Sequence, residues 1–327
     1  MSKPTALISG AGIAGPICAY WLSKAGIQCT VIERASSLRK DGQGIDIRGA
    51  AKQVVRMMGV EETIMAFVTH EKGLAFVDSS GRHRAVFPSD PENAMSFTSD
   101  IEIMRGRLAM IFYEVSKDVT EYIFGDYITD IQDIPASKVS VTFSKGQKRD
   151  FDFVVGADGM RSKMRNLVMP PSSKKEAEEQ LYSLGEYMAF FSIPSLPNDG
   201  EWALWYNAPR RRSIMRRPDT DGCARAYLSV ISSQLKGHEQ TSIPSQKALL
   251  KSIFSDAGWE AARVMQGLET CEDFYMQEIA QVKIPHWYKG RVGLIGDAAY
   301  CPSPISGMGT SLAILGAYVL AGEMMNC

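Results

Sequence analysis

Residues 7–15 read Leu-Ile-Ser-Gly-Ala-Gly-Ile-Ala-Gly, a short apolar run that leads into a G-x-G-x-x-G pattern. The run predicts a strand, the glycines predict a tight turn, and the residues after them predict the start of a helix. Such a turn directs backbone N–H groups and the positive end of a helix dipole at one point, which suits a pyrophosphate. The fingerprint residues are Gly10, Gly12, Ile13, Ala14 and Gly15.

A second strand is predicted at 28–32, and it ends in Glu33. An acidic residue about 20 positions past the glycines is placed to bind a ribose hydroxyl. A glycine-rich turn alone is weak evidence, because plain turns also use glycine. Here the strand, turn, helix and acidic residue occur in the required order, so we interpret the stretch as a dinucleotide site.

The composition favours neither nucleic acid nor a membrane as partner. The formal net charge is −1 and 45% of residues are hydrophobic, with no apolar run as long as a membrane span. The N-terminus shows no basic leader with an apolar segment, so a cytoplasmic protein is expected. The six cysteines contain no C-x-x-C pair and the four histidines are far apart, so we predict reduced thiols and no metal site.

Several polar residues follow predicted strands, where ligands of an open α/β sheet gather. Arg39 and Asp46 lie just beyond the second strand, although a polar surface loop would look the same. Arg105 lies where a strand meets a helix, which makes it a better ligand contact than Arg107 inside that helix. Asp158, in a Gly-Ala-Asp-Gly turn, suits either a cofactor contact or a turn that satisfies itself.

The last part of the chain repeats the strand-then-turn pattern. The run 291–299 is apolar up to Gly296-Asp297, and a second glycine loop at 303–310 precedes an apolar helix. A glycine loop at a helix N-terminus supplies another anion site. Asp297 lies at the carboxyl end of its strand, where we expect ligand contacts.

A second, antiparallel region is predicted from short strands rich in aromatic residues, between about 181 and 280. One face of that sheet is either the wall of a pocket for a flat substrate or simple hydrophobic core. The basic residues at 210–212 and 216–217 predict an exposed sheet edge that deters strand pairing. The alternative is an electrostatic guide for a phosphorylated nicotinamide.

Three motifs therefore stand in order: Gly10-x-Gly12-x-x-Gly15 with Glu33, the turn Gly156–Gly159, and Gly296–Ala299 with Pro304 and Gly307-x-Gly309. Together they resemble the class A, para-hydroxybenzoate hydroxylase-like FAD-dependent monooxygenases. The similarity is greatest to the branch of the tetracycline-inactivating monooxygenase and the fungal natural-product hydroxylases. Segments 42–49 and 212–218 are similar to that branch, and the resemblance covers nearly the whole chain.

The resemblance implies an α/β fold, in which a Rossmann-type, GR2-like FAD-binding domain carries an inserted antiparallel-sheet substrate domain. The predicted FAD-binding domain spans 1–70, 102–178 and 281–327, and the substrate domain spans 71–101 and 179–280. Relatives usually continue into a C-terminal segment that braces both domains. We expect that segment to be absent here, with a second chain as a possible substitute.

The resemblance also implies residue roles. FAD contacts are implied for the glycine fingerprint, Glu33, Arg34, Asp46, Arg105, Asp158, Asp297, Gly307, Met308, Gly309 and Thr310. NADPH contacts are implied for Asp158 and Arg39. The candidates for substrate contact are Phe190, Tyr206 and Pro304. No catalytic side chain is named, because the difficult steps belong to the cofactor.

The implied activity is that NADPH reduces FAD and one oxygen atom of O2 passes to an aromatic or polyketide-like small molecule. Hydroxylation or epoxidation in secondary metabolism is the expected reaction. Tyr300 stands where relatives usually have histidine, and the chain is short. These two features motivate an alternative, an isomerase or cyclase that keeps the flavoprotein fold without redox chemistry.

Overall fold

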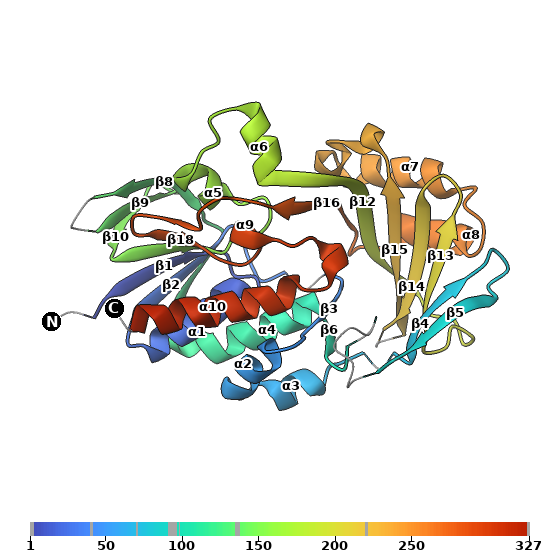
Figure 1. The fold of residues 1–327 in the computed structure, drawn as a ribbon, viewed down its shortest axis with the longest axis horizontal. Helices are drawn as coiled ribbons and strands as arrows, with labels where there is room; N and C mark the ends of the chain where they lie inside the picture. Colours follow the sequence, from blue (N-terminus) through green and yellow to red (C-terminus); the bar gives the residue numbers. More distant parts are fainter. Residues whose placement is uncertain are drawn as a thin grey trace.

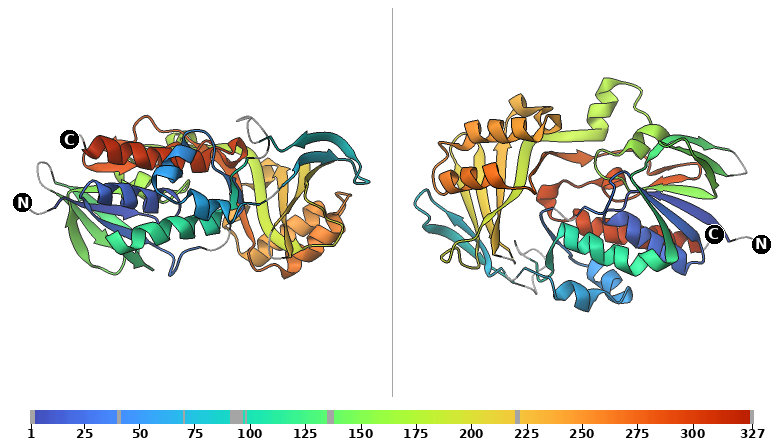
Figure 2. Two further views of the ribbon diagram at one scale, coloured as in Figure 1. Left: turned by 90° about the horizontal axis from the view of Figure 1, so that it is seen from below. Right: turned by 180° about the vertical axis from the view of Figure 1, so that it is seen from behind.

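The computed structural model describes residues 3–39, 42–69, 71–90, 97, 99–134, 138–219 and 222–325. Figure 1 shows two halves side by side, each built on its own sheet, and both chain ends lie at the outer end of the first half. The two further views show the same elongated outline (Figure 2). The α/β fold with an added antiparallel sheet confirms the predicted fold class.

Among the described residues, six strands form the sheet of the first half. In spatial order they are β17 (Tyr288–Lys289), β18 (Val292–Leu294), β11 (Phe153–Gly156), β1 (Thr5–Ser9), β2 (Gln28–Glu33) and β7 (Thr120–Phe124). All of these pairings are parallel except that of β17 with β18. The carboxyl ends of β1, β2, β11 and β18 therefore meet at one edge, as the sequence predicts for a dinucleotide-binding sheet.

Helices cover one face of this sheet and a small antiparallel sheet covers the other. Alternate residues of β1 carry this division, since Ala6 and Ile8 belong to the helix-side core and Leu7 to the opposite core. The helices are α1 (Ala14–Lys24), α4 (Arg105–Ser116) and α10 (Gly309–Met325). The small sheet is β8 (Ile128–Asp133), β9 (Val139–Phe143) and β10 (Lys148–Phe151), next to α5 (Lys163–Val168).

Seven strands of the described chain form the sheet of the second half. Their spatial order is β16 (Tyr275–Val282), β12 (Leu181–Pro194), β15 (Cys223–Ile231), β14 (Arg212–Pro218), β13 (Ala203–Ala208), β4 (Gly73–Val77) and β5 (His83–Pro88). Only the pairing of β13 with β4 is parallel. Two helices, α7 (Ile243–Phe254) and α8 (Ala261–Thr270), pack on its outer face (Figure 1).

The short pair of β3 (Gly44–Asp46) and β6 (Glu102–Met104) lies between the two halves (Figure 1). The remaining helices are α2 (Ala51–Met57), α3 (Glu61–Met65), α6 (Lys174–Gln180), α9 (Asp297–Tyr300) and the 3-10 turns at 117–119, 233–235, 238–240 and 304–306. Of these additional elements, β3 contacts the second sheet directly, because Gly44 N donates to the hydroxyl of Tyr227 at 3.0 Å.

The basic residues of β14 form ion pairs in the interior of the protein. The turn before β14 holds Arg210 and Arg211 at positive φ, and both are exposed. Arg212 and Arg216 point to the helix side, where Arg212 binds Asp256 at 2.7 Å. Since β14 lies between β13 and β15, the predicted sheet edge is wrong. Burial also prevents Arg212 and Arg216 from guiding a nucleotide through solvent.

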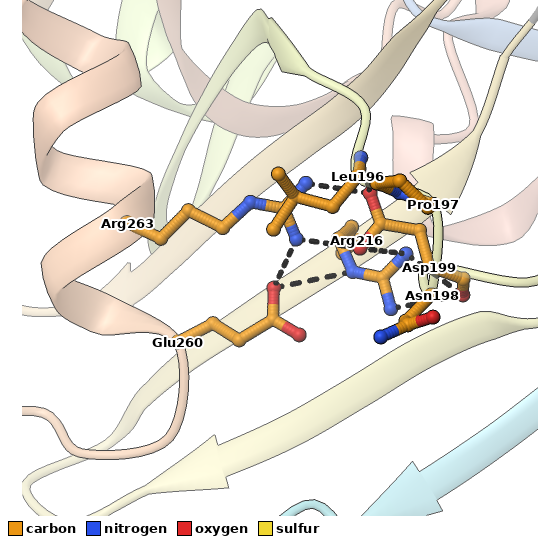
Figure 3. Close-up of a pocket in the computed structure, with 7 residues that line it drawn as sticks. All are labelled: Leu196, Pro197, Asn198, Asp199, Arg216, Glu260 and Arg263. Atoms are coloured by element: carbon orange, nitrogen blue, oxygen red, sulfur yellow. Dashed lines mark hydrogen bonds and ion pairs between the residues drawn. The ribbon is translucent and has the colours of Figure 1, made fainter.

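Arg216 is the centre of a closed charge network around a surface hollow of about 420 Å³ (Figure 3). Its guanidinium lies 3.4 Å from Asp199 and 3.2 Å from Glu260, and Arg263 binds Asp199 at 2.6 Å. Two cations and two carboxylates balance one another there. We therefore infer that the charge network around this hollow holds α8 against the sheet, and we do not assign the hollow to ligand binding.

Replacing Arg216 by methionine is expected to lower the free energy of unfolding by about 3 kcal/mol, because it leaves Glu260 and Asp199 with one buried cation fewer. Urea denaturation measures this loss. The matched control is Arg210→Ala, which removes an exposed partner of Asp256 and should change stability by less than about 1 kcal/mol. Equal effects of the two substitutions would contradict the buried network.

Candidate functional site

The glycine turn after β1 is built from close approaches of the main chain. Gly10 has φ +108° and donates its N–H to the carbonyl of Ile32 at 2.7 Å. A Cβ on Gly10 would lie 2.6 Å from the Ala157 carbonyl oxygen, and one on Gly15 would lie 1.9 Å from that of Gly10. These positions admit only glycine, so the strand ends and α1 come within reach of one ligand.

The N-terminus of α1 is open toward the same point. In the described structure no side chain caps its first turn at Ile13, and no acidic residue lies in that turn. Glu33 accepts hydrogen bonds from the N–H groups of Ala11 and Ala35, both at 2.9 Å. The uncapped helix end leaves N–H groups and a positive dipole for an anion, while Glu33 holds the turn in shape.

Arg105, the first residue of α4, places a positive charge beside this turn. Its Nη2 lies 3.2 Å from the position that a Cβ on Gly12 would take. The side chain is half-buried, and it makes no hydrogen bond or ion pair with any side chain that the structure describes. A half-buried cation without a protein partner, next to an open helix N-terminus, suits a pyrophosphate or a flavin oxygen.

Asp297 and Asp46 lie beside the second glycine loop. Asp297 Oδ1 lies 3.6 Å from the Cβ position of Gly309, and Asp46 Oδ2 lies 3.5 Å from that of Gly307. Burial raises the pKa of Asp297, while the Cys301 thiol and the charge of Arg105 act in the opposite direction. Carboxylates at this edge suit the hydroxyl groups of a ribityl chain or a ribose.

Serine hydroxyl groups stiffen the loop from Ser303 to Met308. Ser303 has φ +89°, rare for a residue with a side chain, and its hydroxyl accepts from Ile305 N at 3.2 Å. Ser306 donates to the Ser303 carbonyl at 2.7 Å and accepts from Met308 N at 3.2 Å. The loop therefore presents Pro304 and Met308 as a fixed apolar edge next to α10. Thr310, in the first turn of α10, is half-buried.

Three residues that the sequence predicts as cofactor contacts, Asp158, Arg34 and Arg39, lack the features described for Arg105 and Asp297. The carboxylate of Asp158 accepts from Ser162 Oγ at 2.5 Å and from Met164 N at 3.0 Å, so it is satisfied within its own turn. Arg34 and Arg39 are exposed, and neither makes a hydrogen bond or ion pair within the described ranges.

The second sheet presents a row of large side chains to the first half. Backbone pairing aligns them across the strands in the order Tyr275, Phe190, Tyr227, Met215, Trp205 and Phe76. Phe190 stacks on Tyr275 with ring centroids 4.9 Å apart, and Trp205 lies 5.6 Å from Phe76. We call these six residues the aromatic row.

Tyr206 lies on the opposite face, because successive residues of a strand point to opposite sides. It is 6% exposed, belongs to the core under α7 and α8, and donates to the Ala257 carbonyl at 3.0 Å. The structure therefore places Tyr206 away from the aromatic row, whereas the sequence predicts it as a substrate contact. Phe190 belongs to the row, although it is only 4% exposed.

A buried ion cluster connects β6 to the second sheet. Arg217 binds Glu71 at 2.7 Å and also contacts Glu102. Burial raises the pKa of Glu102 to about 8, with Arg217 opposing and Glu71 adding to the increase. The Oε2 atom of Glu102 is buried without a hydrogen-bond partner among the described residues. In this cluster one cation, Arg217, contacts two acidic residues, Glu71 and Glu102, where the two halves meet.

The arrangement fits a dinucleotide that carries a flavin. The open end of α1 and Arg105 suit a pyrophosphate, Glu33 suits a ribose, and Asp297 with the Gly307–Gly309 loop suits the other end of such a ligand. The profile of the family described as "FAD binding domain" matches residues 3–326.

The chain belongs to the class A FAD-dependent monooxygenases. It is 37% identical over 340 residues to the flavin-dependent monooxygenase eupH of Phoma sp, with 99% of this chain and 78% of that protein covered. It is 36% identical over 320 residues to a flavin-dependent monooxygenase of Legionella longbeachae, with 97% and 79% covered. The crystal structure of tetracycline destructase Tet(55) is 33% identical, with a TM-score of 0.85, 99% of this chain covered and 81% of that one.

These comparisons confirm the predicted family and the predicted branch, and the chain spans 78% of the length of eupH and 81% of that of Tet(55). In the described part of the chain, no helix has the length and apolar character needed to span a bilayer. The same residues contain no cluster of three potential metal ligands.

Sequence reasoning missed Gln43, Tyr275 and Trp205 as members of the site region. Period-two alternation in β13 and β16 separates Trp205 and Tyr275 from neighbours that face the helices. That signal divides each strand into two sets but does not say which set faces the cofactor. Only the register between strands, which depends on distant pairing, decides it.

We expect Arg105→Ala to weaken FAD binding about tenfold or more, since it removes a charged contact. Asp297→Asn should weaken it to a similar extent by replacing an acceptor oxygen with a donor. Flavin fluorescence titration of the apoprotein measures both. Arg107→Ala is the matched control, because this exposed residue of α4 lies over the Phe67 ring. Wild-type affinity in both test variants would reject these cofactor assignments.

Glu102 is expected to make stability depend on pH. Its pKa in the folded protein, about 8, lies above the ordinary value of 4.5, so the folded state binds the proton more tightly. Stability should therefore fall as the pH rises from about 5 to about 8. Glu102→Gln, which cannot ionise, should flatten this dependence in denaturation midpoints. An unchanged slope would show that the Glu102 cluster is not its source.

Proposed function

We propose that this monooxygenase uses FAD and NADPH to hydroxylate or epoxidise a flat aromatic or polyketide-like small molecule, in secondary metabolism. The observation that carries the proposal is the aromatic row, which faces the half that holds the glycine loops. Its half-buried members, Tyr275, Met215, Trp205 and Phe76, form an apolar surface on which a ring system can stack.

Bound FAD supplies the electron transfer and the activation of O2, which no side chain of this protein provides. The protein's own contribution is to bind and orient. Arg105 and the open end of α1 hold the cofactor's phosphates, and the Ser303–Met308 loop supports its ring. The aromatic row positions the substrate and keeps water from one of its faces.

The polar residues beside the aromatic row support a substrate with hydrogen-bonding groups at its edge. Ser213, Ser229 and Gln277 occupy the next positions on the same face of β14, β15 and β16. An apolar stripe with adjacent hydroxyl and amide groups is typical of sites for small molecules. The name of the related tetracycline destructase supports a multi-ring compound as the first substrate class to test.

The alternative activity, isomerisation or cyclisation without redox chemistry, rests in part on Tyr300. Its hydroxyl fills the space that a Cβ on Gly316 of α10 would take. The centroid of its ring lies 5.0 Å from that of Trp287. Burial raises the pKa of Tyr300, so its phenol stays neutral. These contacts give Tyr300 a packing role, which weakens its value as evidence for a lost oxygen chemistry.

The proposal predicts a yellow protein whose NADPH oxidation in air is accelerated by its substrate, with one oxygen atom incorporated per turnover. Absorption near 450 nm, NADPH consumption and mass spectrometry with ¹⁸O₂ measure these properties on a panel of aromatic and polyketide compounds. Product formed equally well without O2 and NADPH would instead support the isomerase or cyclase.

The aromatic row has its own test in Trp205→Ala. Loss of one stacking ring should raise the substrate KM about two- to tenfold, since such contacts contribute about 0.5–1.5 kcal/mol. FAD affinity should stay unchanged, because Trp205 contacts Phe76 and Asn207 rather than the glycine loops. The control Trp287→Ala removes an exposed ring outside the row. An unchanged KM in Trp205→Ala would exclude it from the substrate surface.

A further inference from the structure

Gly42, Gln43 and Gly44 form a strap that runs between the aromatic row and Arg105. The strap leads into β3, which pairs with β6 so that Gly44 lies opposite Met104. Figure 1 shows this strand pair at the joint between the two halves. The strap therefore contacts Arg105 on one edge and the second sheet on the other.

The contacts on the cofactor side fix the position of Arg105. Its backbone N–H donates to the carbonyl of Gln43 at 3.0 Å, which sets where α4 begins. A Cβ on Gly42, which has φ +145°, would lie 2.9 Å from the Cβ of Arg105. The strap thus lies directly against the stem of the arginine side chain, and its movement would move the guanidinium.

The contacts on the sheet side come from two tyrosine hydroxyl groups. The hydroxyl of Tyr275 donates to Oε1 of Gln43, and the hydroxyl of Tyr227 accepts from Gly44 N at 3.0 Å. Phe190 fixes both rings, since its centroid lies 4.9 Å from that of Tyr275 and 4.8 Å from that of Tyr227. The two hydroxyl groups are therefore rigid supports for the strap.

Both phenols keep their protons in this setting. Burial raises the pKa of Tyr227 to about 12, against the lowering effect of Arg217, and burial also raises the pKa of Tyr275. Tyr275 can thus donate to Gln43 throughout the neutral pH range. Arg105 itself forms no ion pair among the described residues, although its charge acts on the Asp297 carboxylate.

We propose that Tyr275 and Tyr227 are positioning residues for the cofactor: through the strap they set the place of the Arg105 guanidinium. The inference rests on the proposed contact between Arg105 and FAD. It assigns these members of the aromatic row a role toward the cofactor, in addition to their rings lining the substrate face.

A double-mutant cycle on FAD affinity tests this inference. Tyr275→Phe keeps the ring and removes one hydrogen bond, so the dissociation constant of FAD should rise about three- to tenfold. In the Arg105→Ala background the same substitution should change it less than twofold, because the group being positioned is gone. Tyr227→Phe and, from the strap side, Gln43→Ala should behave in the same way.

Tyr206→Phe is the matched control. It removes a buried tyrosine hydroxyl from the opposite face of the same sheet, so it should lower stability without changing FAD affinity. Equal effects of Tyr275→Phe in both backgrounds, or none in wild type, would overturn the positioning role. If Arg105→Ala leaves FAD affinity intact, the cofactor contact of Arg105 fails first, and the inference fails with it.

Discussion

The arrangement of the first half depends on how closely the main chain approaches itself at the end of β1. A Cβ on Gly15 would come within 1.9 Å of one carbonyl oxygen, and a Cβ on Gly10 within 2.6 Å of another. Because glycine has no side chain, the ends of β1 and β11 and the start of α1 can converge there. Arg105, Glu33 and Asp297 lie around that point, where we propose that the cofactor binds.

The buried and half-buried arginines of this protein fall into two groups, which differ in whether a carboxylate forms an ion pair with them. Arg212, Arg216 and Arg217 are held by carboxylates, and they stabilise the second sheet against its helices and against β6. Arg105 is half-buried beside an open helix N-terminus and has no such partner among the described residues. An arginine that forms no ion pair with a described carboxylate is suited to bind a phosphate-bearing ligand.

The sequence predicts well those features that nearby residues determine. The glycine turn, the position of Glu33, and Arg105 at a strand-to-helix junction are local, and the structure has them as predicted. The roles of β14 and Tyr206 depend on which strands lie next to each other and on which face is covered. A run of arginines looks the same on an edge strand and in an interior network, and only distant partners such as Asp199 distinguish them.

The alternation along β13 and β14 has an evolutionary consequence. Trp205 and Met215 face the proposed substrate, while their immediate neighbours Tyr206 and Arg216 face the helices. Substitutions at every second position can therefore alter ligand preference and leave the packing of the sheet against α7 and α8 unchanged. Such a sheet can diversify its chemistry quickly, since the mutations that explore new substrates are physically separate from those that threaten folding.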